Sequence, residues 1–265
     1  MDEQRLREAI VEIGRRLYER GYIVASDGNI SARLPESGHI VTTPTGVCKG
    51  FLTPEMLVVV DAEGRKLEGA LAPSSELAMH LEIYRRRPDV HAVVHAHPPC
   101  GTGFAAAGLS LDEPLVSEIV LALGSIPLAG YGTPSTQELV EAIAPYVPHY
   151  NALLLANHGA VAYGPDLETA YFRMETLEHC ARITLVAKLL GRERPLPAEA
   201  VRKLFQIRER AGMTIPSPPP QRPPETAPSP NETLTLTRQQ LVQLIAQAVE
   251  AALRFLKLTQ MMGRS

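Results

Sequence analysis

The composition of the chain changes abruptly near residue 213, and this change limits how much of the chain can form one packed domain. Residues 216–230 (PSPPPQRPPETAPSP) hold eight prolines, and such a segment adopts an extended, polyproline-like conformation instead of packing into a core. We therefore predict a globular domain over residues 1–212 and a proline-rich linker over residues 213–236. Helical periodicity returns after the linker, which predicts an amphipathic helix within residues 237–265.

The bulk properties of the chain are those of an ordinary globular protein of 265 residues. Hydrophobic residues make up 45% and charged residues 21% of the chain, which allows a sizeable core. The formal net charge of -3 gives no general attraction to nucleic acid or to an anionic membrane surface. The sequence shows no signal peptide and no apolar run of membrane-spanning length, and its three cysteines are scattered, so we expect a cytoplasmic protein with reduced thiols.

Periodicity and turn residues divide the predicted domain into helices and strands. One helix is expected to begin near Ser74 or Ser75 and to end before Pro88. The other expected elements are a helix at 3–20, a turn-rich lead-in at 25–33, a β-meander at 39–70, a strand at 90–99, further strand within 115–131, a capped helix at 133–147, a strand, turn and strand at 151–164, and a long helix at 166–191. Since the elements lack a regular strand–helix–strand alternation, we expect an α/β layered fold with a central, largely antiparallel sheet flanked by helices.

Three histidines lie within the segment VHAVVHAHPP, whose valines and alanines are typical of a buried strand. Because side chains alternate along a strand, His91, His95 and His97 are expected to face the same side. His95 and His97 have the spacing of half a metal site, although a histidine near a strand end is as often an ordinary hydrogen-bonding residue. This segment alone leaves both interpretations open.

Two other segments can complete such a metal site. His158 in LLLANHGAV follows a predicted strand, and the glycine after it permits a close backbone approach or a positive φ. Glu76 in PSSE lies in the first turn of a predicted helix, where the helix dipole favours a carboxylate. Taken singly, His158 is more simply a turn residue and Glu76 an ordinary helix-start residue.

Three turns rich in glycine and hydroxyl residues accompany these candidates. They are DGNIS at 27–31, TPTG at 43–46 and PSSE at 73–76. Backbone N–H groups in such turns, with neighbouring Asn, Thr or Ser side chains, can hold a phosphate without any charged side chain. Each turn alone is equally an ordinary loop or helix cap.

The motifs GNIS, TPTG, PSSE, VVHAHPP and ANHG, in this order and at these intervals, resemble the class II aldolase/adducin family, and within it the L-fuculose-1-phosphate aldolases. The resemblance covers about residues 1–212. It implies one Zn²⁺ per chain bound by Glu76, His95, His97 and His158, with Glu76 acting also as the catalytic acid/base. It implies a homotetramer with active sites at subunit interfaces. The implied phosphate-binding residues are Gly28, Asn29, Thr45, Gly46, Ser74 and Ser75.

The implied reaction is zinc-dependent cleavage of a ketose 1-phosphate of the fuculose or deoxyribulose type to dihydroxyacetone phosphate and an aldehyde such as lactaldehyde. This chemistry needs no Schiff-base lysine, and we interpret Lys49 as a solvated charge. Alternatives in the same superfamily are a pentulose-phosphate 4-epimerase, whose subgroup carries Asp where this chain has Glu76, and a methylthioribulose-1-phosphate dehydratase. A non-catalytic, adducin-like binding module is the alternative of another class, and it is disfavoured because all four metal ligands are present.

The chain departs from the fuculose enzymes in the segment LVSEIVLALGSIP, where those enzymes place a tyrosine that reaches a neighbouring subunit's active site. No tyrosine occurs there, and Glu118 is the only ionisable residue of the segment. Tyr131 follows shortly afterwards. The sequence therefore leaves two candidates, Glu118 and Tyr131, for the acid that protonates the leaving alkoxide. A solvated surface charge is an equally good interpretation of Glu118.

The predicted C-terminal helix carries an apolar stripe that a single helix cannot bury against itself. It begins with Thr237 and Gln240 at capping-box spacing. A short helix on a proline-rich tether resembles the encapsulation peptides that carry enzymes into bacterial microcompartments, so shell proteins are expected partners. A helix used only for oligomerisation of this enzyme is the alternative.

Overall fold

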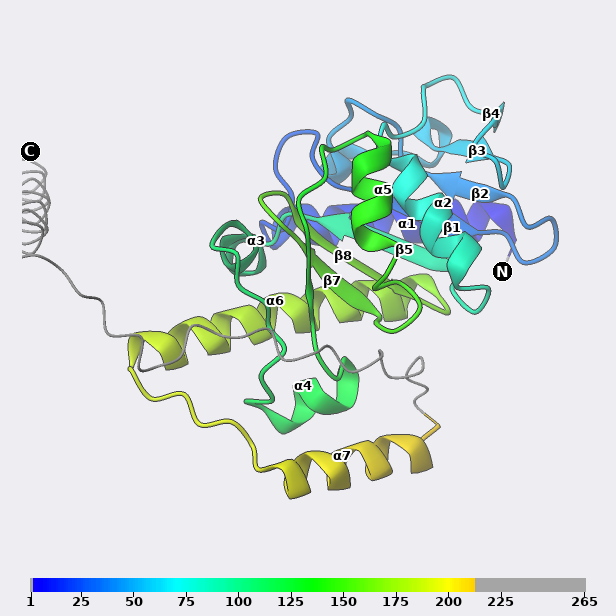
Figure 1. The fold of residues 1–265 in the computed structure, drawn as a ribbon. Coiled ribbons are helices and arrows are strands. Elements are labelled where there is room, and N and C mark those ends of the chain that lie inside the picture. Colours follow the sequence, from blue (N-terminus) through cyan, green and yellow to red (C-terminus); the bar gives the residue numbers. More distant parts are fainter. Residues whose placement is uncertain (1, 213–265) are drawn as a thin grey trace, which may run out of the picture. The chain divides into compact units, whose positions relative to one another are not determined.

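The computed structural model describes residues 2–212, which form an eight-stranded sheet with helices on both faces (Figure 1). The strands are β1 (Asn29–Arg33), β2 (Ile40–Thr42), β3 (Val58–Val60), β4 (Lys66–Glu68), β5 (Ala92–Ala96), β6 (Leu128–Ala129), β7 (Ala152–Leu155) and β8 (Gly159–Gly164). Their order in the sheet is β4-β3-β2-β1-β5-β8-β7-β6. Only β6 and β7 pair in parallel among the described strands, so the expected largely antiparallel sheet is confirmed.

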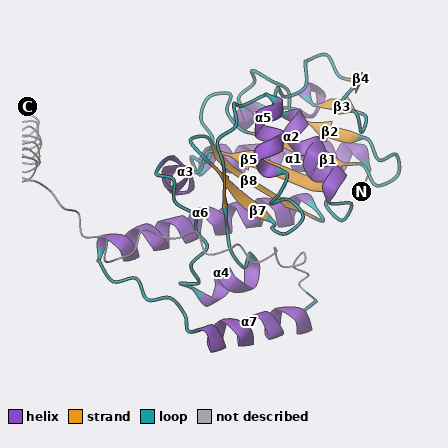
Figure 2. Ribbon diagram, in the orientation of Figure 1, coloured by secondary structure: helices purple, strands orange, loops and turns teal. Residues whose placement is uncertain are grey.

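Helices cover the two faces of this sheet (Figure 2). The α-helices are α1 (Glu3–Glu19), α2 (Leu77–Arg86), α3 (Pro99–Ala106), α4 (Ser117–Ala122), α5 (Gln137–Ile143), α6 (Leu167–Leu189) and α7 (Ala198–Arg210), and the short 3-10 helices are η1 (Lys49–Phe51) and η2 (Pro54–Met56). No helix among residues 2–212 combines the length and apolar character needed to cross a membrane.

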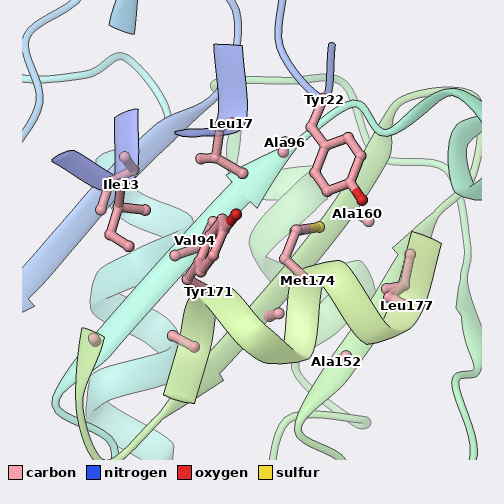
Figure 3. Close-up of a cluster of buried hydrophobic side chains, with 14 of the residues drawn as sticks. Ile13, Leu17, Tyr22, Val94, Ala96, Ala152, Ala160, Tyr171, Met174 and Leu177 are labelled. Atoms are coloured by element: carbon pink, nitrogen blue, oxygen red, sulfur yellow. The ribbon is translucent and has the colours of Figure 1, made fainter. Parts of the chain in front are cut away.

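Successive side chains of the central strand β5 point to opposite faces of the sheet and pack into two separate hydrophobic cores. Val94 packs with side chains of α1 and α6, including Leu17 and Met174 (Figure 3). Its neighbour Val93 points to the other face and joins the core beneath α2 and α5. Both valines are fully buried, as expected for a strand with a helical layer on each side. The two layers hold β5 rigidly, and β5 carries the histidines of the site.

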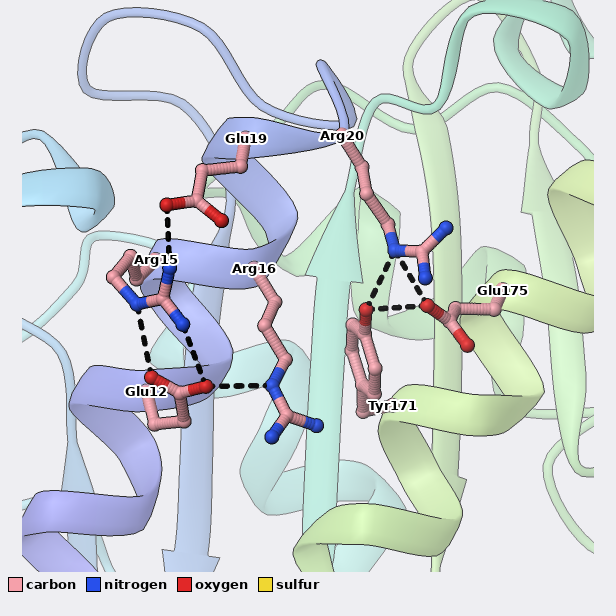
Figure 4. Close-up of polar contacts among 7 residues, drawn as sticks. All are labelled: Glu12, Arg15, Arg16, Glu19, Arg20, Tyr171 and Glu175. Atoms are coloured by element: carbon pink, nitrogen blue, oxygen red, sulfur yellow. Dashed lines mark hydrogen bonds and ion pairs between the residues drawn. The ribbon is translucent and has the colours of Figure 1, made fainter.

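A polar network ties α1 to α6 at the surface (Figure 4). The Nε atom of Arg20 donates to the Tyr171 hydroxyl at 2.9 Å and lies 2.6 Å from an Oε atom of Glu175. Tyr171 in turn donates to Glu175. Exposed pairs of this kind contribute about 0–1 kcal/mol each, so the apolar contacts below them provide most of the docking energy.

Several predicted elements are confirmed, and their caps agree with the sequence. The opening helix, the β-meander, the strand pair β7–β8 and the long helix α6 all occur where expected. Thr136 caps α5 by accepting from the Glu138 N–H, and Asp166 caps α6 by accepting from the Thr169 N–H. The predicted boundary at residue 212, the linker at 213–236 and the helix at 237–265 lie outside the described residues.

Four local predictions are wrong. The lead-in at 25–33 contains strand β1, because β2 and β5 supply hydrogen-bonding partners on both sides. The segment 115–131, expected to contain further strand, holds the two-residue strand β6, but its larger element is helix α4, which lies beside α7. Helix α2 starts later than predicted, so Glu76 is its N-cap rather than a residue of its first turn. Helices α3 and α7 were not predicted, and α3 is rich in Pro and Gly.

Candidate metal centre

Three histidine side chains converge at one end of the central strands. His95 is the second-last residue of β5 and His97 directly follows the strand, while His158 lies in the tight turn between β7 and β8. The antiparallel pairing of Ala96 with Ala160 brings that turn beside the histidine pair. The Nε2 atoms of His95 and His97 lie 3.2 Å apart, and one ligand atom from each of the three residues lies within 4.8 Å of the others. His91 is not part of this group, since it lies roughly 13 Å along the strand from His95 at about 3.3 Å per residue.

The carboxylate of Glu76 completes the group. Its Oε2 atom lies 3.3 Å from His95 Nε2, and its Oε1 atom lies 3.2 Å from His158 Nε2. A tetrahedral metal with ligands at roughly 2.0–2.1 Å places those ligands roughly 3.3 Å apart. These three spacings are close to that edge, so the donor set suits a divalent metal.

A backbone carbonyl and a carboxylate contact the Nδ1 atoms of two histidine rings and so orient them. His95 Nδ1 is hydrogen-bonded to the Ala160 carbonyl at 2.9 Å, which leaves the Nε2 lone pair for a metal. His97 Nδ1 lies 3.6 Å from Asp27 Oδ2. Gly159 follows His158, and a Cβ atom there would lie 2.5 Å from His97 Cδ2 and 2.7 Å from the Ala96 carbonyl oxygen. The expected close approach at this glycine is therefore confirmed, while the positive φ belongs to Asn157 at 55°.

The electrostatics of the group keep Glu76 and His97 in the forms that bind a metal. Burial alone would raise the pKa of Glu76, but the charges and hydrogen bonds of His95 and His158 outweigh burial and hold this pKa well below its usual range. Burial, reinforced by repulsion from His95 and His158, lowers the pKa of His97 to about 4. At neutral pH the carboxylate is thus ionised and the His97 imidazole is neutral, as metal ligation requires.

The three turns predicted to bind phosphate meet beside this centre. Asn29 Nδ2 donates to Glu76 Oε2 at 2.9 Å, which joins the first turn to the third. The Thr45 N–H donates to the Ala72 carbonyl at 3.1 Å and the Ser74 N–H to the Thr43 carbonyl at 3.2 Å, which joins the second turn to the third.

Glycines shape two of these turns. Gly28 and Gly46 take positive φ values of +67° and +71°. A Cβ on Gly28 would lie 2.8 Å from the His95 carbonyl oxygen, so this turn packs directly on the strand that carries the histidines. Ser75 is exposed beside Ser74 and Glu76. The structure thus brings all of the predicted phosphate-binding residues to one end of the sheet.

The interpretation of Lys49 as a solvated charge is wrong. Lys49 is only 2% exposed, because η1 packs against α1 at Gly14. Its Nζ atom donates to the Ser26 carbonyl. The sequence offered one signal for this residue, which is its position three residues after the TPTG turn.

A second buried residue near the centre was also missed. His80 lies one turn after Glu76 on α2 and is 1% exposed. Its Nδ1 atom is hydrogen-bonded to Ser31 Oγ at 2.7 Å, and Ser31 is bonded in turn to the Tyr84 hydroxyl at 2.8 Å. Burial, with repulsion from His95, lowers the pKa of His80 to about 3, so its ring is neutral.

Glu118 and Tyr131 are the two candidates for the leaving-group acid. Glu118 is exposed in the first turn of α4 and lines a pocket of about 520 Å³ with Tyr22, His179 and Arg182. Tyr131 is 61% exposed after β6. Neither side chain forms a hydrogen bond or ion pair with the metal-binding residues within the described chain.

Comparison with known proteins identifies the family of this site. The model of the class II aldolase and adducin N-terminal domain matches residues 8–185, a range that includes every residue of the centre. The chain belongs to the class II aldolase and adducin family. It is a metal-dependent lyase of this superfamily, and its three histidines form the corresponding metal site.

Similar proteins within the family carry out more than one reaction. The 3-oxo-tetronate 4-phosphate decarboxylase of Escherichia coli strain K12 is 36% identical over 210 residues, which cover 78% of this chain and 96% of that protein. The 5-deoxy-D-ribulose 1-phosphate aldolase of Bacillus thuringiensis serovar kurstaki is 35% identical over 202 residues, which cover 76% of this chain and 94% of that protein. The solved structure of the L-fuculose-1-phosphate aldolase of Thermus thermophilus matches with a TM-score of 0.63 and 34% identity, covering 73% of this chain and 99% of that chain. The expected family and fold are thereby confirmed.

Proposed function

We propose that the protein is a zinc-dependent aldolase that cleaves a ketose 1-phosphate, of the L-fuculose 1-phosphate type, to dihydroxyacetone phosphate and an aldehyde such as lactaldehyde. The observation that carries the proposal is the convergence of Glu76 and three histidines beside turns suited to a phosphate. Zinc is the proposed metal because three imidazoles and one carboxylate at a tetrahedral spacing suit it. Loss of these ligands would be expected of a non-catalytic adducin-like module, and this chain keeps them.

We assign each group of residues at the site a separate role in such a reaction. A bound divalent metal would supply Lewis-acid stabilisation of the negative charge on the substrate oxygens. Glu76 is aimed by Asn29, and we assign to this carboxylate the proton transfer at the carbon next to the carbonyl. The backbone N–H groups of the turns would hold the phosphate and fix the carbon chain against Glu76. Glu118 or Tyr131 would serve the leaving oxygen from a neighbouring subunit of a homotetramer.

A decarboxylase acting on a 3-oxo sugar-acid phosphate is the second candidate. The similarity to the Escherichia coli decarboxylase favours it, and so does the lack of a tyrosine in the segment around Glu118. Loss of CO₂ from a 3-oxo-tetronate 4-phosphate also yields dihydroxyacetone phosphate, and it needs no acid for a leaving alkoxide. The two reactions therefore share a metal, a phosphate site and a product, and they differ in the second product.

The test is to measure both products from each substrate class. Purified zinc-loaded enzyme is given L-fuculose 1-phosphate, 5-deoxy-D-ribulose 1-phosphate or 3-oxo-tetronate 4-phosphate, and triose phosphate, aldehyde and CO₂ are quantified. We expect equal amounts of triose phosphate and aldehyde from a ketose 1-phosphate. Release of triose phosphate with CO₂ only from the 3-oxo acid would establish the second candidate instead. A pentulose-phosphate epimerase or a methylthioribulose-1-phosphate dehydratase would release no triose phosphate.

We also propose that residues 237–265, which lie outside the described residues, direct this cytoplasmic enzyme into a bacterial microcompartment by binding its shell proteins. The apolar stripe of the predicted helix supports this proposal. Packaging of the enzyme would also confine its reactive aldehyde product within the shell. A fluorescent protein fused to residues 213–265 is expected to form puncta in cells that make matching shells. Diffuse fluorescence, or puncta that persist after Leu244→Glu with Ile245→Glu, would contradict the proposal.

A further inference from the structure

Lys49 is a buried cation whose charge no ion pair neutralises within residues 2–212. Its side chain is 2% exposed, and its one hydrogen-bond acceptor among the described residues is the carbonyl oxygen of Ser26. An ammonium group has three N–H donors, so two remain without a described acceptor. A buried charge is costly unless it is paired, so an anion that reached these two donors would be bound favourably.

The position of Lys49 identifies that anion. The residue lies three positions after Gly46, in the second phosphate-type turn, and its Nζ atom bonds to Ser26, two positions before Gly28 in the first turn. The ammonium thus bridges the two turns whose glycines take positive φ values. Asp27 and Glu76 place two carboxylates nearby, and both favour the charged form of Lys49, against burial, which lowers its pKa.

A carboxylate beside the turns disfavours a phosphate site built only from uncharged donors. A sugar phosphate is dianionic near neutral pH, and Asp27 would repel it, whereas a bound divalent metal would offset the charge of Glu76. A lysine at the junction of the turns offsets this repulsion and offers free N–H donors to the phosphate oxygens. A neutral side chain could donate the hydrogen bond to the Ser26 carbonyl equally well, so that bond alone does not explain why a charged residue occupies this position.

We propose that Lys49 binds the phosphate group of the substrate and is the cationic member of the phosphate site. This assignment rests on the proposed function, because it assumes a phosphorylated substrate. It adds a charged, buried residue to a set that otherwise consists of backbone N–H groups and small polar side chains.

The test measures binding of inorganic phosphate to zinc-loaded, full-length protein by titration calorimetry. Lys49→Gln keeps a donor for the Ser26 carbonyl and removes the charge, while Lys49→Arg keeps the charge. We expect Lys49→Gln to weaken phosphate binding by about tenfold to a hundredfold, the usual range for a hydrogen bond to a charged group, and Lys49→Arg to restore most of the loss. The matched control is Lys66→Gln, because exposed Lys66 also donates to a carbonyl, that of Leu71, and its loss is expected to change nothing.

Zinc content and the salt dependence of binding separate a direct role from a structural one. Lys49→Gln should keep one zinc per chain, and its phosphate affinity should fall less steeply with added salt than that of the unaltered protein. Unaltered phosphate binding by Lys49→Gln would overturn the assignment, as would equal losses in Lys49→Gln and Lys49→Arg. Failure of the unaltered protein to bind phosphate would overturn the phosphate site of the proposed function and the role of Lys49 with it.

Discussion

Substitution of Gly159 by alanine is expected to disturb the metal centre without replacing any of its ligands. A Cβ at this position would lie 2.5 Å from His97 Cδ2 and 2.7 Å from the Ala96 carbonyl oxygen. Carbon atoms in ordinary contact lie about 3.5–4.0 Å apart, so the imidazole must move by about 1 Å. Metal–ligand distances tolerate only about 0.2 Å, and the backbone oxygen on the other side leaves the methyl group no alternative space.

The expected result is a zinc dissociation constant raised by at least about tenfold, the scale of changes that misorient a ligand. Overpacking of this kind also costs about 1–3 kcal/mol of folding free energy. Competition with a chromophoric chelator measures the first quantity, and thermal unfolding of the metal-free protein measures the second. Gly103→Ala is the control, because a Cβ on Gly103 of α3 meets nothing within 4 Å and alanine usually stabilises a helix. Zinc affinity unchanged in Gly159→Ala would refute the steric argument.

Three further predictions concern single residues. Glu76→Gln should abolish turnover while zinc loss stays partial, and near-normal turnover in the purified variant would exclude Glu76 as the base. Burial lowers the pKa of His80 to about 3 in the folded protein, so below a pH of about 6.5 the unfolded chain binds more protons than the folded one. His80 alone should therefore reduce the free energy of unfolding of the metal-free protein by about 2 kcal/mol between pH 7 and pH 5. Denaturant unfolding of His80→Gln should show a pH dependence that is shallower by this amount, and an identical pH profile would argue against this assignment. Asp166→Ala removes the cap of α6 and should cost about 1 kcal/mol in the same assay, with zinc content unchanged; an unaltered midpoint would show that the cap contributes nothing.

The sequence singled out the three histidines that the structure brings together because they lie in short motifs whose local structure is simple. His95 and His97 follow from strand alternation, and the glycine after His158 indicated a close approach that the structure confirms at Gly159. What the motifs could not supply is the contact that places Glu76 between His95 and His158, since it depends on how α2 packs on the sheet. The resemblance to a known family supplied that part.

Other features were fixed by packing between distant segments and could not be read from a local pattern. Lys49 is buried because η1 lies against Gly14 of α1, and nothing near Lys49 in the sequence reports that contact. Asn29 begins a strand because it pairs with His95 of β5, although Asn and Gly usually indicate a turn. The segment around Glu118 forms a helix that buries Ile119 in the main hydrophobic core and lies beside α7.

The most direct test of the account is the dependence of product release on the metal. The enzyme is stripped with a chelator and titrated with Zn²⁺, and triose phosphate release from L-fuculose 1-phosphate is followed with a coupled assay. We expect no release from the stripped enzyme and a linear rise that ends at one equivalent of Zn²⁺ per chain, as a single centre formed by Glu76, His95, His97 and His158 requires. Full activity in the stripped enzyme, or no triose phosphate at any zinc concentration, would contradict the account.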